Sequence, residues 1–170
     1  EGFENAGYTL LIDRQTGILP GGAEAAMTEE EKKAKAESLT GNEDPNAKVV
    51  YMTFDHGPSS KTPAVLDILK RYNVKATFFV VGQCAEKYPE SMKALHSAGH
   101  QVMNHSNTHA HYPQLSPQEV ADDLNACNDK IEAVTGVRPT LIRLPYGDYD
   151  DRSISAVRSA GMEPIQWDVD

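Results

Sequence analysis

Two histidines at a spacing of four residues, His105 and His109, are the first candidates for chemistry in the sequence. On a helical turn this spacing points both imidazoles in the same direction, and imidazole nitrogen is a common zinc ligand. The pair alone is a weak indication, because surface histidines also occur at this spacing. His111 is an additional candidate, but it follows His109 by only two residues and is expected to face elsewhere.

Two further polar clusters follow apolar segments of the chain. Asp55 and His56 come directly after the apolar run 49–54, and a Gly-Pro pair then turns the chain. An isolated acid at such a place more often caps a turn than takes part in catalysis. Arg143 ends the apolar segment 140–143, before a second Pro/Gly turn. A surface salt bridge would be its ordinary role, but an arginine at the end of so apolar a segment more often has a buried carboxylate partner.

The hydrophobic pattern predicts a scaffold that brings these clusters together. Buried strands are predicted over 49–54, 76–81, 101–103, 140–143 and 164–169. Four helices are predicted between them, over 62–72, through Met92 and Leu95 to Gly99, over 116–136, and from Ile154 to Gly161. This alternation implies an α/β fold with a parallel sheet and right-handed crossovers. All strands then end at one edge of the sheet, and the polar clusters lie at that edge.

The composition is that of one globular domain. The chain has 170 residues, 39% of them hydrophobic, and a net charge of 16 − 25 = −9. The acidic balance argues against nucleic-acid binding, which needs clustered Lys and Arg, and no apolar run approaches the ~20 residues of a transmembrane segment. Two cysteines, Cys84 and Cys127, are too few for a disulfide scaffold, and whether they pair stays open. Residues 1–47 are predicted to be an N-terminal appendage, a linker or the tail of an upstream domain.

Three motifs together resemble the first three motifs of the NodB-homology polysaccharide deacetylases, which form carbohydrate esterase family four. The motifs are Thr53-Phe54-Asp55-His56-Gly57-Pro58, His105-Ser106-x-x-His109 and Arg143-x-Pro145-Tyr146-Gly147. The resemblance covers residues 48–170 and implies a distorted (β/α) barrel with fewer than eight regular strands. It also implies the removal of N- or O-linked acetyl groups from polysaccharides with the help of one divalent metal ion.

The resemblance further implies a role for each matching residue. Asp55 matches the general base, and Arg143 matches the arginine that orients it. The backbone N–H of Tyr146 matches a donor to the oxyanion. Trp167 to Asp170 resembles the start of a fourth motif, in which an acid, Asp168 or Asp170, tunes the catalytic acid. Three histidines occupy the metal-ligand positions: His56, His105 and His109.

The sequence departs from the family pattern at two places. His56 stands where the family has Asp, so the expected ligand set is three imidazoles, which favours zinc, with cobalt or nickel also possible, over magnesium or manganese. No histidine follows His111, so the general acid of the fifth family motif is missing. We therefore expect a C-terminally incomplete domain that is truncated, cleaved or completed by a separate polypeptide. Loss of general acid catalysis typically costs ~10²–10⁴-fold in rate, so the isolated chain is expected to be poorly active.

The expected function is hydrolysis of acetyl groups at carbon–nitrogen (non-peptide) or ester bonds of a polysaccharide. The expected substrates are a cell-wall glycan containing N-acetylglucosamine, a chitin-type oligomer or an acetylated xylan. The alternative is a catalytically impaired module that binds metal and carbohydrate, because of His56 and the missing general acid. A metal hydrolase of another class, such as a phosphatase, is disfavoured, since phosphate-cradling Gly-rich or basic loops are absent. The family works outside the cytoplasm, so the chain is expected to be secreted or attached to the cell surface.

Overall fold

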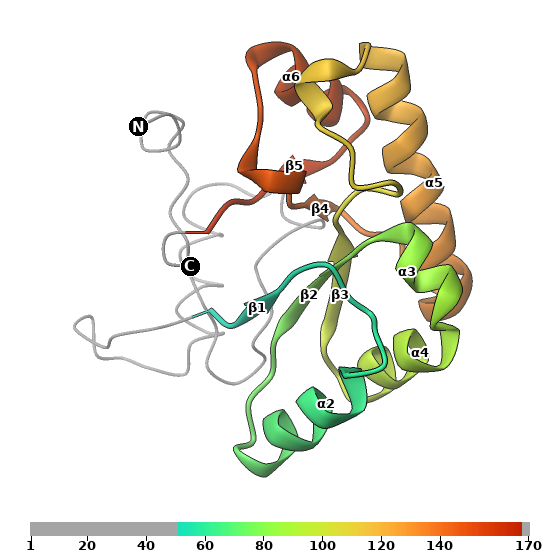
Figure 1. Cartoon of the computed structure of the whole chain (residues 1–170), viewed down its shortest axis with the longest axis vertical. Coiled ribbons are helices and arrows are strands. Elements are labelled where there is room, and N and C mark those ends of the chain that lie inside the picture. Colours follow the sequence, from blue (N-terminus) through green and yellow to red (C-terminus); the bar gives the residue numbers. More distant parts are fainter. Residues whose placement is uncertain (1–50, 168–170) are drawn as a thin grey trace, which may run out of the picture.

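A parallel five-stranded sheet forms the centre of the computed structural model, which describes residues 51–167 (Figure 1). The strands pair in chain order as β1-β2-β3-β4-β5. Their bounds are Thr53–Phe54 for β1, Thr77–Val80 for β2, Gln101–Asn104 for β3, Leu141–Ile142 for β4 and Glu163–Pro164 for β5. Within residues 51–167 no pairing joins β1 to β5, so the sheet is open. The predicted α/β class with an incomplete barrel is confirmed, whereas the segment 1–47 and Asp168 lie outside the described residues.

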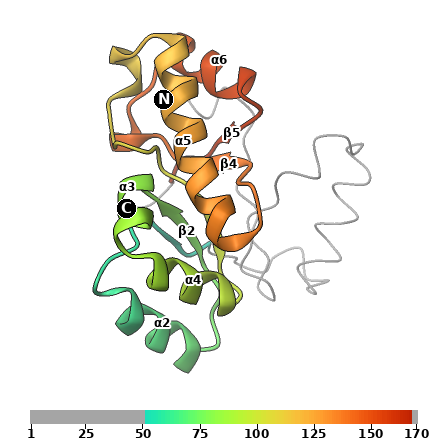
Figure 2. The same cartoon turned by 90° about the vertical axis from the view of Figure 1, so that its right-hand side faces the viewer.

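The described part of the chain has five α-helices, which lie along one side of this sheet, and Figure 2 shows that side facing the viewer. Their bounds are Thr62–Arg71 for α2, Gly82–Lys87 for α3, Pro89–Ser97 for α4, Pro117–Thr135 for α5 and Asp151–Ser159 for α6. Two short 3₁₀ helices, η3 (Tyr112–Gln114) and η4 (Pro145–Gly147), interrupt the connections after β3 and β4. No helix among these is long and apolar enough to cross a membrane.

The longest helix, α5, is fixed at both ends by the residues that its sequence predicts. Ser116 and Glu119 form a reciprocal capping box, in which the Ser116 hydroxyl accepts from the Glu119 backbone N–H and the Glu119 carboxylate accepts from the Ser116 N–H. Gly136 ends the helix at a φ of 72°, in the left-handed region that favours glycine. Both ends of the helix are therefore fixed by hydrogen bonds or backbone conformation, and α5 can serve as a rigid support for the segments that pack against it.

Several predicted elements differ from the structure. The strands predicted over 49–54 and 140–143 are the two-residue strands β1 and β4, and residues 49–50 lie outside the described part of the chain. The single helix predicted through Met92 and Leu95 is two helices, because Tyr88 leaves the helical conformation before Pro89 starts α4. A residue before proline avoids the α region for steric reasons. The fifth strand is also shorter than predicted: β5 ends at Pro164, and Ile165 continues the pairing only through its N–H bond to the Ile142 carbonyl.

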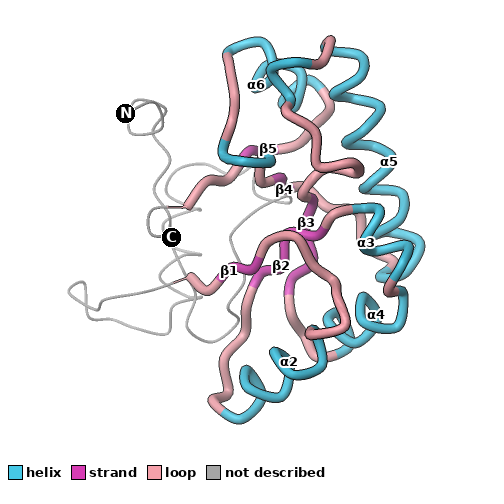
Figure 3. The backbone as a smooth tube through the Cα atoms, in the orientation of Figure 1, coloured by secondary structure: helices cyan, strands magenta, loops and turns pink. Residues whose placement is uncertain are grey.

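Alternate residues of the strands pack on opposite faces of the sheet. Phe78 and Val80 belong to the core beneath α2, α3 and α4, whereas Phe79 belongs to a cluster on the other face with Met103 and Leu141. The strands are short segments between long loops (Figure 3). Both faces of β2 are buried, which explains the continuous apolar run in its sequence.

The two cysteines do not form a disulfide. Cys84 is half-buried and Cys127 is buried, and both are free thiols. Burial raises the pKa of the Cys127 thiol to about 12, so this side chain is an unreactive part of the core, where its thiol donates to the Val80 carbonyl.

Candidate metal centre

The three polar segments follow β1, β3 and β4, at the same edge of the parallel sheet. Asp55 and His56 come directly after β1, the loop from His105 comes directly after β3, and Arg143 comes directly after β4. The structure therefore confirms that these segments meet at the carboxyl ends of the strands, and their side chains lie close together.

Three imidazoles form a nearly equilateral triangle. The ring centroids of His56, His105 and His109 are 5.0, 4.8 and 4.9 Å apart, and the rings are tilted by 58–70° to one another. Each ring offers one nitrogen that lies within 4.8 Å of the nitrogens of the other two. His105 is buried, His109 is half-buried and His56 is exposed, so burial decreases across the triangle. Mutually tilted imidazoles around a common centre are the arrangement that a three-histidine metal site requires.

The hydrogen bonds of His105 leave one ring nitrogen available to a metal. Nδ1 lies 2.7 Å from the Arg143 carbonyl oxygen, which can only accept, so Nδ1 carries the proton. Nε2 is buried and has no hydrogen-bond partner, and the same is true of Nε2 of His109. Buried polar atoms are normally paired, so two unpaired nitrogens at one centre fit a cation as their missing partner.

The electrostatic environment keeps these two imidazoles neutral. Burial lowers the pKa of His105 to about 4, against smaller raising effects from the Arg143 carbonyl and the Asp55 carboxylate. Burial also lowers the pKa of His109, helped by the charges of His56 and His111. A neutral imidazole is the form that binds a metal ion, so the protein holds both side chains ready for ligation at neutral pH.

Arg143 and Asp55 form a partly buried ion pair beside the histidines. The Arg143 Nη1 donates to Asp55 Oδ1 at 3.0 Å and to the Thr53 hydroxyl at 2.6 Å. The guanidinium lies 4.3 Å from the centre of the Phe79 ring, and its side chain is only 3% exposed. Burial lowers the pKa of Arg143, and the adjacent Asp55 carboxylate opposes that shift. The predicted carboxylate partner of this arginine is therefore Asp55, which is half-buried.

Tyr146 lies next to the triangle, in the sharp turn η4. The residue is 57% exposed, and its ring contacts the His109 ring edge-on, with the ring centroids 4.5 Å apart, and stacks on the His111 ring, with the centroids 3.9 Å apart. His111 is therefore outside the triangle, as predicted, and its Nδ1 lies 3.0 Å from Asp148 Oδ2. Gly147 follows at a φ of 63°, where a Cβ atom would come within 2.7 Å of the Trp167 ring, so the turn tolerates only glycine there.

Left-handed backbone conformations concentrate at this site. Five non-glycine residues between 51 and 167 have a positive φ, and four of them belong to the three polar segments. These four are His56, Ser106, His109 and Tyr146. Each such conformation costs on the order of 1–3 kcal/mol in a non-glycine residue and is typical of functional sites, where surrounding contacts hold it.

The sequence did not indicate two residues that support the site. Thr53 accepts a hydrogen bond from Arg143, and Asp148 holds His111. Thr53 lies 90 residues from Arg143 in the chain, so only the fold brings the two together. Of the predicted site residues, Asp168 lies outside the described residues, and the other six lie at this one edge of the sheet.

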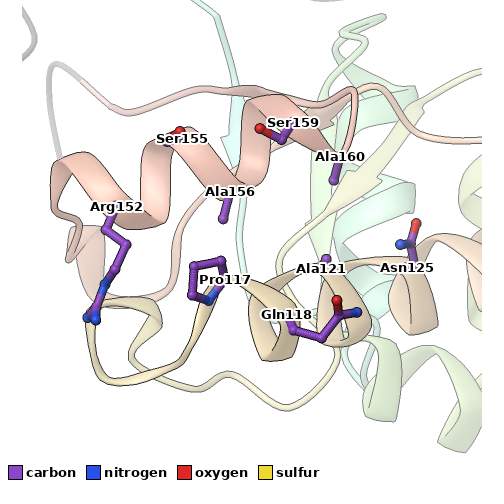
Figure 4. A pocket seen from close by; sticks show the side chains of 9 residues that line it. All are labelled: Pro117, Gln118, Ala121, Asn125, Arg152, Ser155, Ala156, Ser159 and Ala160. Carbon is purple, nitrogen blue, oxygen red and sulfur yellow. The ribbon is translucent and has the colours of Figure 1, made fainter.

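A surface hollow of about 430 Å³ lies elsewhere, between α5 and α6 (Figure 4). Its lining includes Pro117, Ala121 and Asn125 of α5 together with Arg152 and Ser159 of α6. None of the histidines, Asp55 or Arg143 lines it. The candidate site is therefore defined by its side-chain chemistry and not by this hollow.

Comparison with known proteins identifies the family. The sequence model of the polysaccharide deacetylase family matches residues 42–165. The peptidoglycan-N-acetylmuramic acid deacetylase PdaC of Bacillus subtilis is 41% identical over 147 residues, which are 85% of this chain and 31% of that protein. A peptidoglycan-N-acetylglucosamine deacetylase of Bacillus cereus is 34% identical over 126 residues, 74% of this chain and 46% of that protein. The chain thus spans less than half the length of either relative.

Solved structures agree in fold. The structure of PdaC matches with a TM-score of 0.68 at 41% identity, over 74% of this chain and 61% of that one. A carbohydrate esterase family 4 pseudoenzyme of Bacillus anthracis matches with a TM-score of 0.67 at 33% identity, over 73% of this chain and 44% of that one. From its sequence match and its fold, this chain belongs to the polysaccharide deacetylase family.

Proposed function

We propose that this chain is a metal-dependent deacetylase that removes acetyl groups from the amino sugars of a cell-wall glycan. The observation that carries the proposal is the triangle of three imidazoles beside the Asp55–Arg143 ion pair. The names of the two bacterial relatives support an N-acetylated peptidoglycan sugar as substrate, in preference to a chitin-type oligomer or an acetylated xylan. Because peptidoglycan lies outside the cytoplasmic membrane, we also propose that the protein acts there.

The metal would be held by His56, His105 and His109. The unpaired, buried Nε2 atoms of His105 and His109 support this assignment, and the nitrogen-only ligand set favours zinc. When bound, such an ion supplies a Lewis acid that polarises the acetyl carbonyl and acidifies a water molecule. The protein itself must then supply a base, hold that base in place and stabilise the charge that develops on the acetyl oxygen.

Asp55 is proposed as the base. Its Oδ1 accepts from Arg143, which leaves Oδ2 to take a proton from the attacking water. Arg143 pairs with the carboxylate and fixes its direction, because the guanidinium is itself held by Thr53 and the Phe79 ring. The backbone N–H of Tyr146 is proposed to donate to the oxyanion, and the left-handed turn at this residue gives that peptide its unusual orientation.

The second candidate function is a module that binds metal and carbohydrate without turnover. Two observations favour it: His56 stands at a position where the family has an acid, and a pseudoenzyme is among the proteins of the same fold. The two functions differ in one measurable product, acetate.

Removal of the metal tests the proposed function directly. Dialysis of the chain against a chelator should abolish acetate release from N-acetylated glycan strands, and added zinc or cobalt should restore it, because the base alone cannot polarise the carbonyl. Acetate is measured enzymatically, with chitin oligomers and acetylated xylan as comparison substrates. Release that persists after chelation would contradict metal dependence. Stoichiometric zinc binding without acetate from any of the three substrates would favour the binding module.

His56→Ala tests the third ligand. Zinc affinity should fall by at least about tenfold, because two imidazoles remain where three converge. His111→Ala is the matched control: His111 lies outside the triangle, so its loss should leave zinc affinity within about twofold of the unchanged chain. Competition with a coloured chelator measures both variants. Equal zinc affinity in His56→Ala and the parent chain would show that His56 is not a ligand.

Asp55→Asn separates the base from the metal site. The amide can still accept from Arg143 through its oxygen but cannot take a proton, so kcat should fall by ~10²–10⁴-fold while zinc remains bound. Asp67→Asn, an exposed acid on α2, serves as the control and should leave kcat unchanged. A kcat for Asp55→Asn close to that of Asp67→Asn would refute the assigned base.

The pH dependence of zinc binding follows from the lowered pKa values of His105 and His109. Protons compete with zinc only when an imidazole can be protonated, so these two ligands resist competition until the pH falls below the ordinary histidine value of about 6.5. Zinc content should stay constant from pH 8 to pH 7 and be lost by about pH 4, near the pKa of His105. Metal analysis after equilibration at each pH gives the answer. Zinc that stays bound below pH 4 would argue against histidine ligation.

A further inference from the structure

The loop that carries His105 and His109 has little regular structure of its own. It leaves β3 at Asn104 and adopts left-handed conformations at Ser106 and His109 before η3 begins. Two of the three imidazoles of the candidate metal centre depend on this loop for their positions. Something outside the loop must therefore hold its backbone.

Asp123, a half-buried residue of α5, accepts four hydrogen bonds from this segment. Its Oδ2 accepts from the Asn107 backbone N–H at 2.8 Å and from the Tyr112 hydroxyl at 3.1 Å. Its Oδ1 accepts from the Thr108 backbone N–H at 3.1 Å and from the Thr108 hydroxyl at 2.6 Å. Both oxygens are thus used twice, and every donor lies between His105 and the end of η3.

Only a carboxylate can serve all four donors. An ionised carboxylate has two acceptor oxygens and no donor, whereas an amide of the same shape has one oxygen and an NH₂ group. Burial raises the pKa of Tyr112, and the Asp123 charge adds to that shift, so the tyrosine hydroxyl keeps its proton and remains a donor. Replacement of Asp123 by Asn would point an amide donor at two of these four donors.

The support behind Asp123 is rigid, and the opposite side of the loop is also held. Asp123 follows Val120 by three residues and precedes Cys127 by four, so it lies on the inward face of the doubly capped helix α5. The loop carbonyls of Ser106 and Asn107 accept from the first N–H groups of α3, those of Gly82 and Gln83. The N–H and hydroxyl donors of the loop are therefore bound by α5, and the carbonyl acceptors of the loop are bound by α3.

We propose that Asp123 is a positioning residue that sets the metal affinity of the site by fixing the loop between its two histidines. This inference rests on the proposed metal site. Asp123 forms no hydrogen bond with either histidine and acts through the backbone at Asn107 and Thr108. Without it the loop must be ordered when the metal binds, and that ordering weakens binding.

The test compares two neighbouring acids of α5 in the full 170-residue chain. Asp123→Asn should weaken zinc binding by about 10- to 100-fold, the usual loss for an outer partner of a metal site. Asp122→Asn is the matched control, because Asp122 is exposed and accepts only from the Gln118 side chain, so zinc affinity should stay within about twofold. Zinc affinity is measured by chelator competition. Thermal unfolding of the metal-free variants, followed by circular dichroism, should remain cooperative in both.

A milder variant keeps the test decisive if Asp123→Asn does not fold. Thr108→Val retains the shape of the side chain but removes one donor to Asp123, and the loss of one hydrogen bond should weaken zinc binding by about 2- to 10-fold. The inference would be overturned if Asp123→Asn bound zinc as tightly as the parent chain does. If only Thr108→Val folds, the same result in that variant would overturn it. In either case the proposed function would be left intact. Failure of the parent chain to bind zinc would instead overturn the proposed function.

Discussion

The rest of the site depends on the hydrogen bonds that the buried guanidinium of Arg143 forms. The guanidinium joins the end of β4 to Thr53 of β1 and to Asp55, the residue directly after β1, and its Nε lies 3.4 Å from the Ile165 carbonyl beyond β5. The carbonyl of the same residue fixes the tautomer of His105. A charge removed from water must be paired, and an uncompensated one typically costs about 3–5 kcal/mol, so the fold and the site are constrained by the same side chain.

The loops around this arginine illustrate how a small sheet can support strained backbone. The left-handed residues of the site are held by hydrogen bonds and ring contacts: the Ser106 hydroxyl accepts from the His109 backbone N–H, and Tyr146 is stacked on His111. The helices α3 and α5 contribute N–H groups and a carboxylate to one loop from two sides. Contacts made several residues away thereby stabilise the strained backbone of the histidine-bearing loops. Such contacts preorganise a site before any ligand binds.

Sequence patterns predicted the scaffold better than they predicted its connections. The parallel sheet follows from the alternation of strands and helices, and the meeting of Asp55, His56, His105 and Arg143 follows from the placement of each after a strand. The break before Pro89 was missed because apolar periodicity continues across it. Thr53 and Asp123 were missed because their partners are distant in sequence, although an acid on the apolar stripe of α5 was a usable signal.

The three imidazoles differ in burial, so one side of the candidate metal centre faces the core and the other side faces solvent. His105 is enclosed by the core and His109 is partly covered, whereas His56 faces solvent on the loop after β1. The side of the centre that is open to solvent is therefore the side of His56, and an ion bound there would exchange most directly past this residue. Exchange kinetics would then report on the segment after β1, whereas equilibrium occupancy would report on all three nitrogens together.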